Sequence, residues 1–315
     1  MISGLVRLGV LFACLLAHPA GAADSAKGVL IAKQALAREA RCTGCHDEME
    51  GKPILSIYQT RHGVKADSRT PVCQDCHGDS EKHANTPQNS QRFPPTDLRF
   101  LPKQVPAGER SAPCLGCHQS NTVRHWSGSS HERHDLACPD CHTIHAPQDP
   151  VLARRSQAKT CWSCHPTERM QLHLPSAHPV IKGRMSCTEC HNPHGSTGPK
   201  LLHQESTQAT CLSCHPDKRG PFLWEHAPVT EDCTACHAPH GATTRPLLKM
   251  RSPWLCQQCH SASRHPATAY SSNSGSNVGI AASLSVTSQL ALRGCTNCHS
   301  QVHGSNHPGG ARFLR

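Results

Sequence analysis

The sequence predicts a mostly irregular, elongated chain of short α-helices with little β structure, organised in five tandem repeats. Two features of the composition support this class. Only 3% of the 315 residues are aromatic and 36% are hydrophobic, while 25 are proline and 22 are glycine. Such a chain buries too little apolar side chain to offset the entropy lost on ordering. The third observation is an excess of 21 cysteines and 26 histidines, so the core is expected to come from groups that these residues hold.

The cysteines form ten Cys-x-x-Cys pairs, and every pair is followed at once by histidine. Disulfide scaffolds and zinc sites do not require a histidine at that fixed place. Cys-x-x-Cys-His is the attachment motif of c-type haem, in which two thioethers hold the porphyrin and the adjacent histidine binds the iron. The sequence therefore predicts a multihaem cytochrome c with a haem-filled core and ten covalently bound c-type haems.

The haem-binding cysteines are Cys42, Cys45, Cys73, Cys76, Cys114, Cys117, Cys138, Cys141, Cys161, Cys164, Cys187, Cys190, Cys211, Cys214, Cys233, Cys236, Cys256, Cys259, Cys295 and Cys298. The motif histidines, expected as proximal iron ligands, are His46, His77, His118, His142, His165, His191, His215, His237, His260 and His299.

Residues 1–22 have the features of a secretory signal peptide, which leaves residues 23–315 as the mature cytochrome. Arg7 provides the basic start, residues 8–16 are apolar, and the small residues 20–22 suit cleavage. Cys14, the one cysteine outside the motifs, leaves a lipid anchor as a minor alternative. Export to the periplasm fits haem attachment outside the cytoplasm. No later stretch reaches the ~20 apolar residues of a membrane-spanning helix.

The motifs group in pairs, which gives five dihaem repeats at about 23–100, 101–150, 151–200, 201–250 and 251–315. Residues 30–41 are expected to form a helix before the first motif, and the motifs themselves are expected on helices of one to three turns. Two insertions lack motifs. Residues 84–113, rich in proline and polar side chains, are predicted as an extended loop, and residues 266–294 as a hairpin or short helix.

Each repeat places one histidine between its two motifs and another shortly after the second motif. These are the expected distal iron ligands: His62, His83, His131, His145, His178, His194, His226, His240, His265 and His303. Five histidines of the mature chain are left over: His125, His134, His173, His203 and His307. His125 and His173 are the main rivals to the chosen set.

Spacing restricts which haem a distal histidine serves. His194 follows the proximal His191 by three residues on the same side of that haem, so it is expected to bind a neighbouring haem. Methionine is the alternative distal ligand, but Met49, Met170, Met185 and Met250 do not recur with the repeat. With two histidines on every iron no coordination site remains for a substrate, which favours electron transfer over catalysis. The net charge of +10 is offset by haem propionates, so no nucleic-acid partner is expected.

Several strings resemble the MtrA/MtoA/PioA (DmsE-related) family of periplasmic and outer-membrane decahaem cytochromes: HAPQDPVL, CHNPHGSTGPKLL, KRGPFLWEHAP, LCQQCH and CHSQVHGSNHP. The resemblance covers nearly the whole mature chain. It implies a haem wire that lies inside an outer-membrane β-barrel porin of the MtrB type. Such a wire passes electrons between periplasmic carriers and extracellular iron or a surface multihaem cytochrome, in Fe(II) oxidation or Fe(III) and metal reduction.

Two other functions remain open from the sequence. A soluble periplasmic electron shuttle would need no membrane partner. A multihaem reductase of nitrogen or sulfur compounds would keep one iron open, often with lysine in place of the proximal histidine, or would carry a tyrosine cross-link. All ten motifs end in histidine and the only tyrosines are Tyr58 and Tyr270, which argues against the enzyme.

Overall fold

The computed structural model describes residues 20–47, 51, 53–65, 69–101, 104–260 and 294–314, without the side chains of residues 20–27 and 121. The chain divides into two compact units. Unit 1 comprises Met1–Arg99 and Ile144–Pro147, and unit 2 comprises Phe100–Thr143 and Gln148–Arg315. The predicted signal peptide lies largely outside the described residues, and the predicted element at 266–294 lies wholly outside them.

Unit 1 is built on α1 (Ala20–Thr43), which contains the helix predicted at residues 30–41 and extends it in both directions. Alanine has the highest helix propensity, and the Ala-rich start accounts for the added length. The unit also contains η1 (Ile54–Gln59), α2 (Cys73–His77) and α3 (Glu81–Ala84). The end of α1 packs against α2, so the first two motifs lie together.

Polar side chains join these elements of unit 1. Glu39 on α1 is 3% exposed, forms an ion pair with Lys65 at 2.8 Å and accepts a hydrogen bond from the Tyr58 hydroxyl at 2.9 Å. Because the two partners neutralise and solvate the buried carboxylate, it can lie beside the Cys73 thiol at 3.7 Å.

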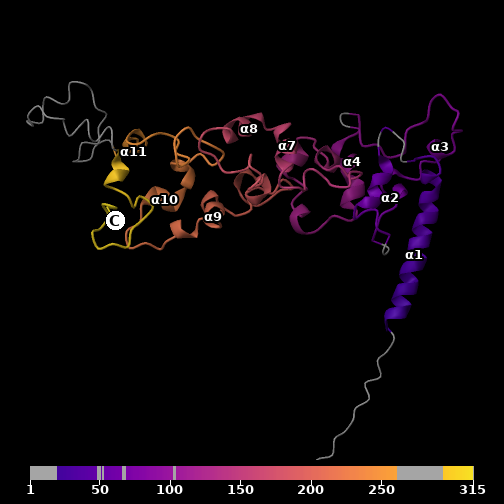
Figure 1. Cartoon of the computed structure of the whole chain (residues 1–315), viewed down its shortest axis with the longest axis horizontal. Coiled ribbons are helices and arrows are strands. Elements are labelled where there is room, and N and C mark those ends of the chain that lie inside the picture. Colours follow the sequence, from indigo (N-terminus) through magenta and orange to yellow (C-terminus); the bar gives the residue numbers. More distant parts are fainter. Residues whose placement is uncertain are drawn as a thin grey trace, which may run out of the picture. The chain divides into compact units, whose positions relative to one another are not determined.

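In unit 2 the helices follow one another in chain order along the unit, from α4 to α11 (Figure 1). The α-helices are α4 (Ala107–Leu115), α5 (Ser130–Arg133), α6 (Cys138–Cys141), α7 (Gln157–Trp162), α8 (Pro166–Leu172), α9 (Thr207–Leu212), α10 (Ala227–Glu231) and α11 (Trp254–Gln257). The 3₁₀ turns are η2 (Asn121–Val123), η3 (Cys187–Glu189), η4 (Pro199–Leu201), η5 (Pro216–Lys218), η6 (Cys233–Ala235) and η8 (Cys295–Asn297).

The two motifs of each repeat lie on different kinds of helix. The first motif of a repeat begins within the last turn of an α-helix, as Cys161 does in α7 and Cys211 in α9. The second motif forms a single turn of its own, α-helical at Cys138 and 3₁₀ at Cys187 and Cys233. This alternation supports grouping the motifs in pairs.

Irregular backbone with little β structure is confirmed in the described part of the chain, where strand-like pairing is limited to isolated bridges. Two of these bridges join neighbouring repeats. Ser176 and Ala242 exchange backbone hydrogen bonds of 3.1 and 2.7 Å, and Trp224 and Ser305 exchange two of 2.9 Å. Each bridge lies beside histidines predicted as distal ligands, so it fixes the backbone that carries them.

The predicted loop at residues 84–113 is wrong at its C-terminal end, because α4 begins at Ala107. The cause is tertiary packing of α4 against α6. Arg110, only 2% exposed, donates to the Asp140 carboxylate of α6 and to the backbone carbonyls of Val105 and Asp135. A polar segment therefore forms a helix, and an arginine on its buried side is neutralised by an ion pair with a neighbouring helix.

Apolar packing is sparse in the described residues. One cluster joins Ala158, Leu172 and Val180 with the partly buried Trp162 and Met185 around the third repeat. None of the helices in the described part of the chain is long and apolar enough to cross a membrane.

Candidate haem-binding sites

The first cysteines of the two motifs in each repeat lie close enough for their thiols to interact. This holds for all five repeats: Cys42 with Cys73, Cys114 with Cys138, Cys161 with Cys187, Cys211 with Cys233, and Cys256 with Cys295. Because a c-type haem is attached through these thiols, the two motifs of a repeat bring two haem attachment points close together.

The second cysteines make the complementary link between repeats. Cys141 lies close enough to Cys164 to interact electrostatically, and the same is true of Cys190 with Cys214 and of Cys236 with Cys259. Each pair joins the second motif of one repeat to the first motif of the next. The attachment points in unit 2 therefore form a series in which neighbouring thiols interact within a repeat and, electrostatically, between repeats.

Seven motif histidines lie opposite a predicted distal histidine. The ring centres are 6.0–6.2 Å apart in the pairs His46–His83, His77–His145, His131–His165, His142–His194, His191–His240, His226–His260 and His237–His303. Two metal–imidazole bonds of roughly 2.0 Å, each continued by about 1.1 Å to the ring centre, give a separation of about 6.2 Å. The residues present therefore fit an iron held between two imidazoles.

The pairs in unit 2 follow a simple rule of register. A histidine that lies between motifs faces the first motif of the next repeat, as His131 faces His165 and His226 faces His260. A histidine that follows the second motif faces the second motif of the previous repeat. His194 thus lies 6.0 Å from His142, a neighbouring motif, as the spacing of His194 from His191 leads one to expect.

The remaining predicted ligands are only partly placed. His118, His215 and His299 are the motif histidines outside these seven pairs, and His62, His178 and His265 are the distal ones. His265 lies outside the described residues. His178 makes the same backbone contact as His131 and His226, so it occupies the equivalent position in its repeat.

That contact is a hydrogen bond from Nδ1–H to a carbonyl of the following repeat. The distances are 2.7 Å from His131 to Pro193, 2.6 Å from His178 to Pro239, and 2.9 Å from His226 to Val302. A carbonyl only accepts, so Nδ1 carries the proton and Nε2 keeps a lone pair for iron. The outer hydrogen bond thus fixes both the tautomer and the ring orientation of each histidine.

Motif histidines are oriented in the same way. Nδ1 of His191 donates to the Lys200 carbonyl and Nδ1 of His237 to the Pro246 carbonyl, both at 2.9 Å. His299 donates to the Arg312 carbonyl at 2.5 Å. His142 differs, since its partner is the Asp149 carboxylate at 2.6 Å.

Burial favours the neutral imidazole that binds a metal. It lowers the pKa of His194, with a smaller contribution from the neighbouring His142, and it lowers the pKa of His240, with a smaller contribution from His191. Burial likewise lowers the pKa of His77 and of His303, where Lys218 adds to the effect. A histidine must be neutral to coordinate iron, so the buried sites favour ligation.

The five left-over histidines have other surroundings. His134 donates to its own helix at Ser130, His203 bonds to the Thr188 carbonyl through Nε2, and the His307 ring accepts from the Gly309 amide. His173 lies against the Trp162 ring at 6.3 Å. In the described part of the chain, none of these five rings lies opposite a motif histidine, although two were rivals for that role.

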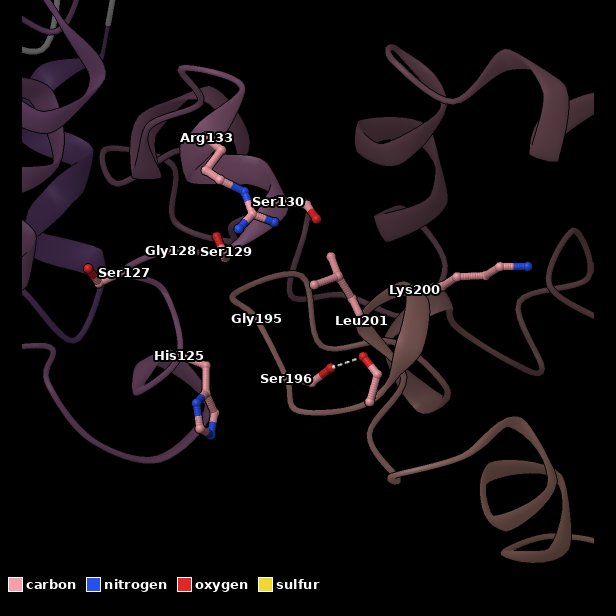
Figure 2. A pocket seen from close by; sticks show the side chains of 11 residues that line it. His125, Ser127, Gly128, Ser129, Ser130, Arg133, Gly195, Ser196, Lys200 and Leu201 are labelled. Carbon is pink, nitrogen blue, oxygen red and sulfur yellow. Dashed lines mark hydrogen bonds between the residues drawn. The ribbon is translucent and has the colours of Figure 1, made fainter.

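His125 lines an open polar pocket of about 280 Å³ between the segment before α5 and the loop that carries Gly195 (Figure 2). Figure 2 shows the Arg133 guanidinium over Ser129, whereas the Lys200 side chain extends away from the other lining residues. The sequence does not identify this pocket, because its members are scattered over two repeats and form no motif. Arg133 brings a positive charge to the pocket and lies on the same short helix, α5, as His131.

Comparison with known proteins supports the haem assignment. Residues 178–220 and 226–265 match the family described as the doubled CXXCH motif, and residues 73–160 match the family described as cytochrome c-type protein NrfB-like. The chain is also 42% identical over 280 residues to the multiheme cytochrome MtrA of Shewanella baltica (strain OS185). That alignment covers 87% of this chain and 80% of the relative.

Proposed function

Because the chain belongs to the MtrA family of multihaem electron-transfer cytochromes and carries covalently bound c-type haems, we propose that it conducts electrons through ten haems across the outer membrane. Each of the ten motifs would hold one haem with two histidine ligands. The haems supply one-electron carriers, and the chain's own residues set their spacing and orientation.

One observation carries this proposal: the thiols at the haem attachment points interact alternately within a repeat and, electrostatically, between repeats. The Cys161 thiol interacts with that of Cys187 within the third repeat, and the Cys190 thiol interacts electrostatically with that of Cys214 in the fourth. A bound haem would therefore have one neighbour on each side rather than standing alone. This arrangement suits conduction along the chain better than storage in separate sites.

The histidine pairs support the same conclusion, since each ligand pair in unit 2 joins two different repeats. Neighbouring repeats are then held together through the iron as well as through the backbone bridges. We extend the register to His178 and propose that it serves the iron of His215. We also propose that His62 and His265 complete the ligands. No iron would then have an open site, which argues against a reductase.

We propose an outer-membrane β-barrel porin of the MtrB type as the partner, with the cytochrome on the periplasmic side and inside the barrel. In hydrocarbon, irregular backbone leaves polar groups unpaired at a cost of several kcal/mol each. A barrel would shield that backbone over the ~40–45 Å of a bilayer with its headgroups. Periplasmic carriers would exchange electrons at one end, and extracellular iron or a surface multihaem cytochrome at the other.

Reconstitution tests the proposal. Liposomes that enclose a redox dye and carry the purified barrel with the holocytochrome should exchange electrons with external iron, and neither component alone should do so. Equal rates from the cytochrome without the barrel, or no exchange by the complex, would favour a soluble periplasmic shuttle. Carbon monoxide binding by the reduced wild-type protein would instead indicate an open iron and favour a reductase.

A further inference from the structure

Asp149 is the only acidic side chain that accepts a hydrogen bond from a second-motif histidine among those described in unit 2. Its Oδ2 lies 2.6 Å from Nδ1 of His142. The equivalent atoms of His191, His237 and His299 each face a backbone carbonyl instead. The difference is visible in the sequence once the geometry is known. The residue seven positions after the motif histidine is Asp149 in the second repeat, and in the later repeats it is Gly198, Thr244 and Asn306.

The contact is a built one. The Asp149 side chain is 11% exposed and that of His142 is 25% exposed, so water screens the interaction only partly. The second carboxylate oxygen accepts from the backbone amides of Thr143 and Val151, each at 3.3 Å. These amides hold the carboxylate in place, and none of the described lysine or arginine side chains forms an ion pair with it. Its negative charge therefore acts on the imidazole.

We propose that Asp149 is a positioning residue that lowers the reduction potential of the haem held at Cys138 and Cys141. A carboxylate that accepts the outer hydrogen bond makes a histidine a stronger electron donor than a carbonyl does. A more basic ligand, with a negative charge nearby, stabilises ferric over ferrous iron. The haem of the fourth motif is then the one most biased towards the oxidised state among the second-motif haems of unit 2.

This inference rests on the proposed ligation by His142, but not on the membrane conduit. The test compares purified full-length holoprotein with its Asp149→Asn, Asp149→Glu and Glu189→Gln variants. Asparagine at position 149 keeps a hydrogen-bond acceptor but removes the negative charge. Glutamate at the same position keeps the charge. Glu189→Gln is the matched control, because Glu189 lies inside the next second motif and pairs with Arg154 at 3.1 Å rather than with a histidine. Haem counts by mass spectrometry verify that each variant is fully loaded.

In a redox titration followed by electron paramagnetic resonance, one low-spin component should respond to Asp149→Asn. Its ratio of reduced to oxidised iron at a fixed potential should rise at least tenfold, which is about 59 mV for a one-electron couple. Asp149→Glu, which keeps the negative charge, should show a much smaller rise. If no component shifts tenfold, or if Glu189→Gln shifts one equally, the inference is overturned. A high-spin iron at the fourth motif of the wild-type protein would overturn the proposed ligation by His142 and this inference together.

Discussion

The imidazole rings of His191 and His240 lie 6.1 Å apart, centre to centre, although they belong to successive repeats. His240 follows its own motif histidine, His237, by only three residues, and His237 instead faces His303. The three-residue spacing keeps both side chains on the same side of one haem site. An iron between His191 and His240 would therefore tie the third repeat to the fourth.

Replacing His240 by alanine should open one iron while all ten haems stay attached, because the thioether bonds do not involve this side chain. The reduced variant should bind carbon monoxide at about one haem in ten, and the oxidised variant should gain a high-spin signal. His203→Ala is the control, since that ring bonds to the Thr188 carbonyl and faces no motif histidine. If His203→Ala opened an iron and His240→Ala did not, the proposed register would be wrong.

The wild-type holoprotein should contain ten haems, all low-spin. Ten motifs and an equal number of distal histidines in register with them motivate this expectation. Mass spectrometry of the intact protein counts the haem additions, and electron paramagnetic resonance reports spin state. Fewer than ten additions, or a substantial high-spin ferric signal, would contradict the expectation.

The motif chemistry and the class of fold could be predicted from the sequence because both depend on short spacings. Five consecutive positions define the two thioethers and the iron ligand of each haem, and the helix at residues 30–41 follows from local propensity. The partner of each distal histidine could not be predicted. His191 and His240 are 49 positions apart, and their meeting depends on backbone bridges such as Ser176 with Ala242.

Two other features escaped the sequence for a related reason. The start of α4 was predicted as loop because its residues are polar, yet Arg110 is buried by the carboxylate of Asp140, 30 positions later. Asp149 likewise resembles any loop aspartate until its contact with His142 is known. In both cases a contact with a charged or polar partner elsewhere in the chain allows a polar residue to be buried. Hydrophobic patterning does not detect such contacts.

Gly195→Ala should destabilise the protein by about 1–3 kcal/mol, because the glycine has no space for a side chain. A Cβ atom there would lie 2.0 Å from the His125 carbonyl oxygen, and φ is +111°. Denaturation followed by haem circular dichroism measures the loss. Since Gly195 follows His194, the variant should also weaken the site of His142. Gly108→Ala is the control: a Cβ atom added there in α4 would meet nothing within 4 Å beyond its own helix, so the change should be neutral or stabilise by about 0.4–1 kcal/mol.

Arg110→Met should destabilise the second repeat by about 3–5 kcal/mol, because it removes one partner of a buried ion pair and leaves the other uncompensated. The side chains of Arg110 and Asp140 are 2% and 15% exposed, so little water is available to solvate the remaining carboxylate. Arg154→Met is the matched control, since Arg154 is 60% exposed in its pair with Glu189 and its loss should cost under about 1 kcal/mol. Chemical denaturation of both holoproteins gives the comparison.

Adding Asp140→Asn to Arg110→Met should recover part of the loss, because the neutral amide needs no counter-charge. Equal losses in the two single variants would show that the pair does not act as a buried link between α4 and the motif helix α6.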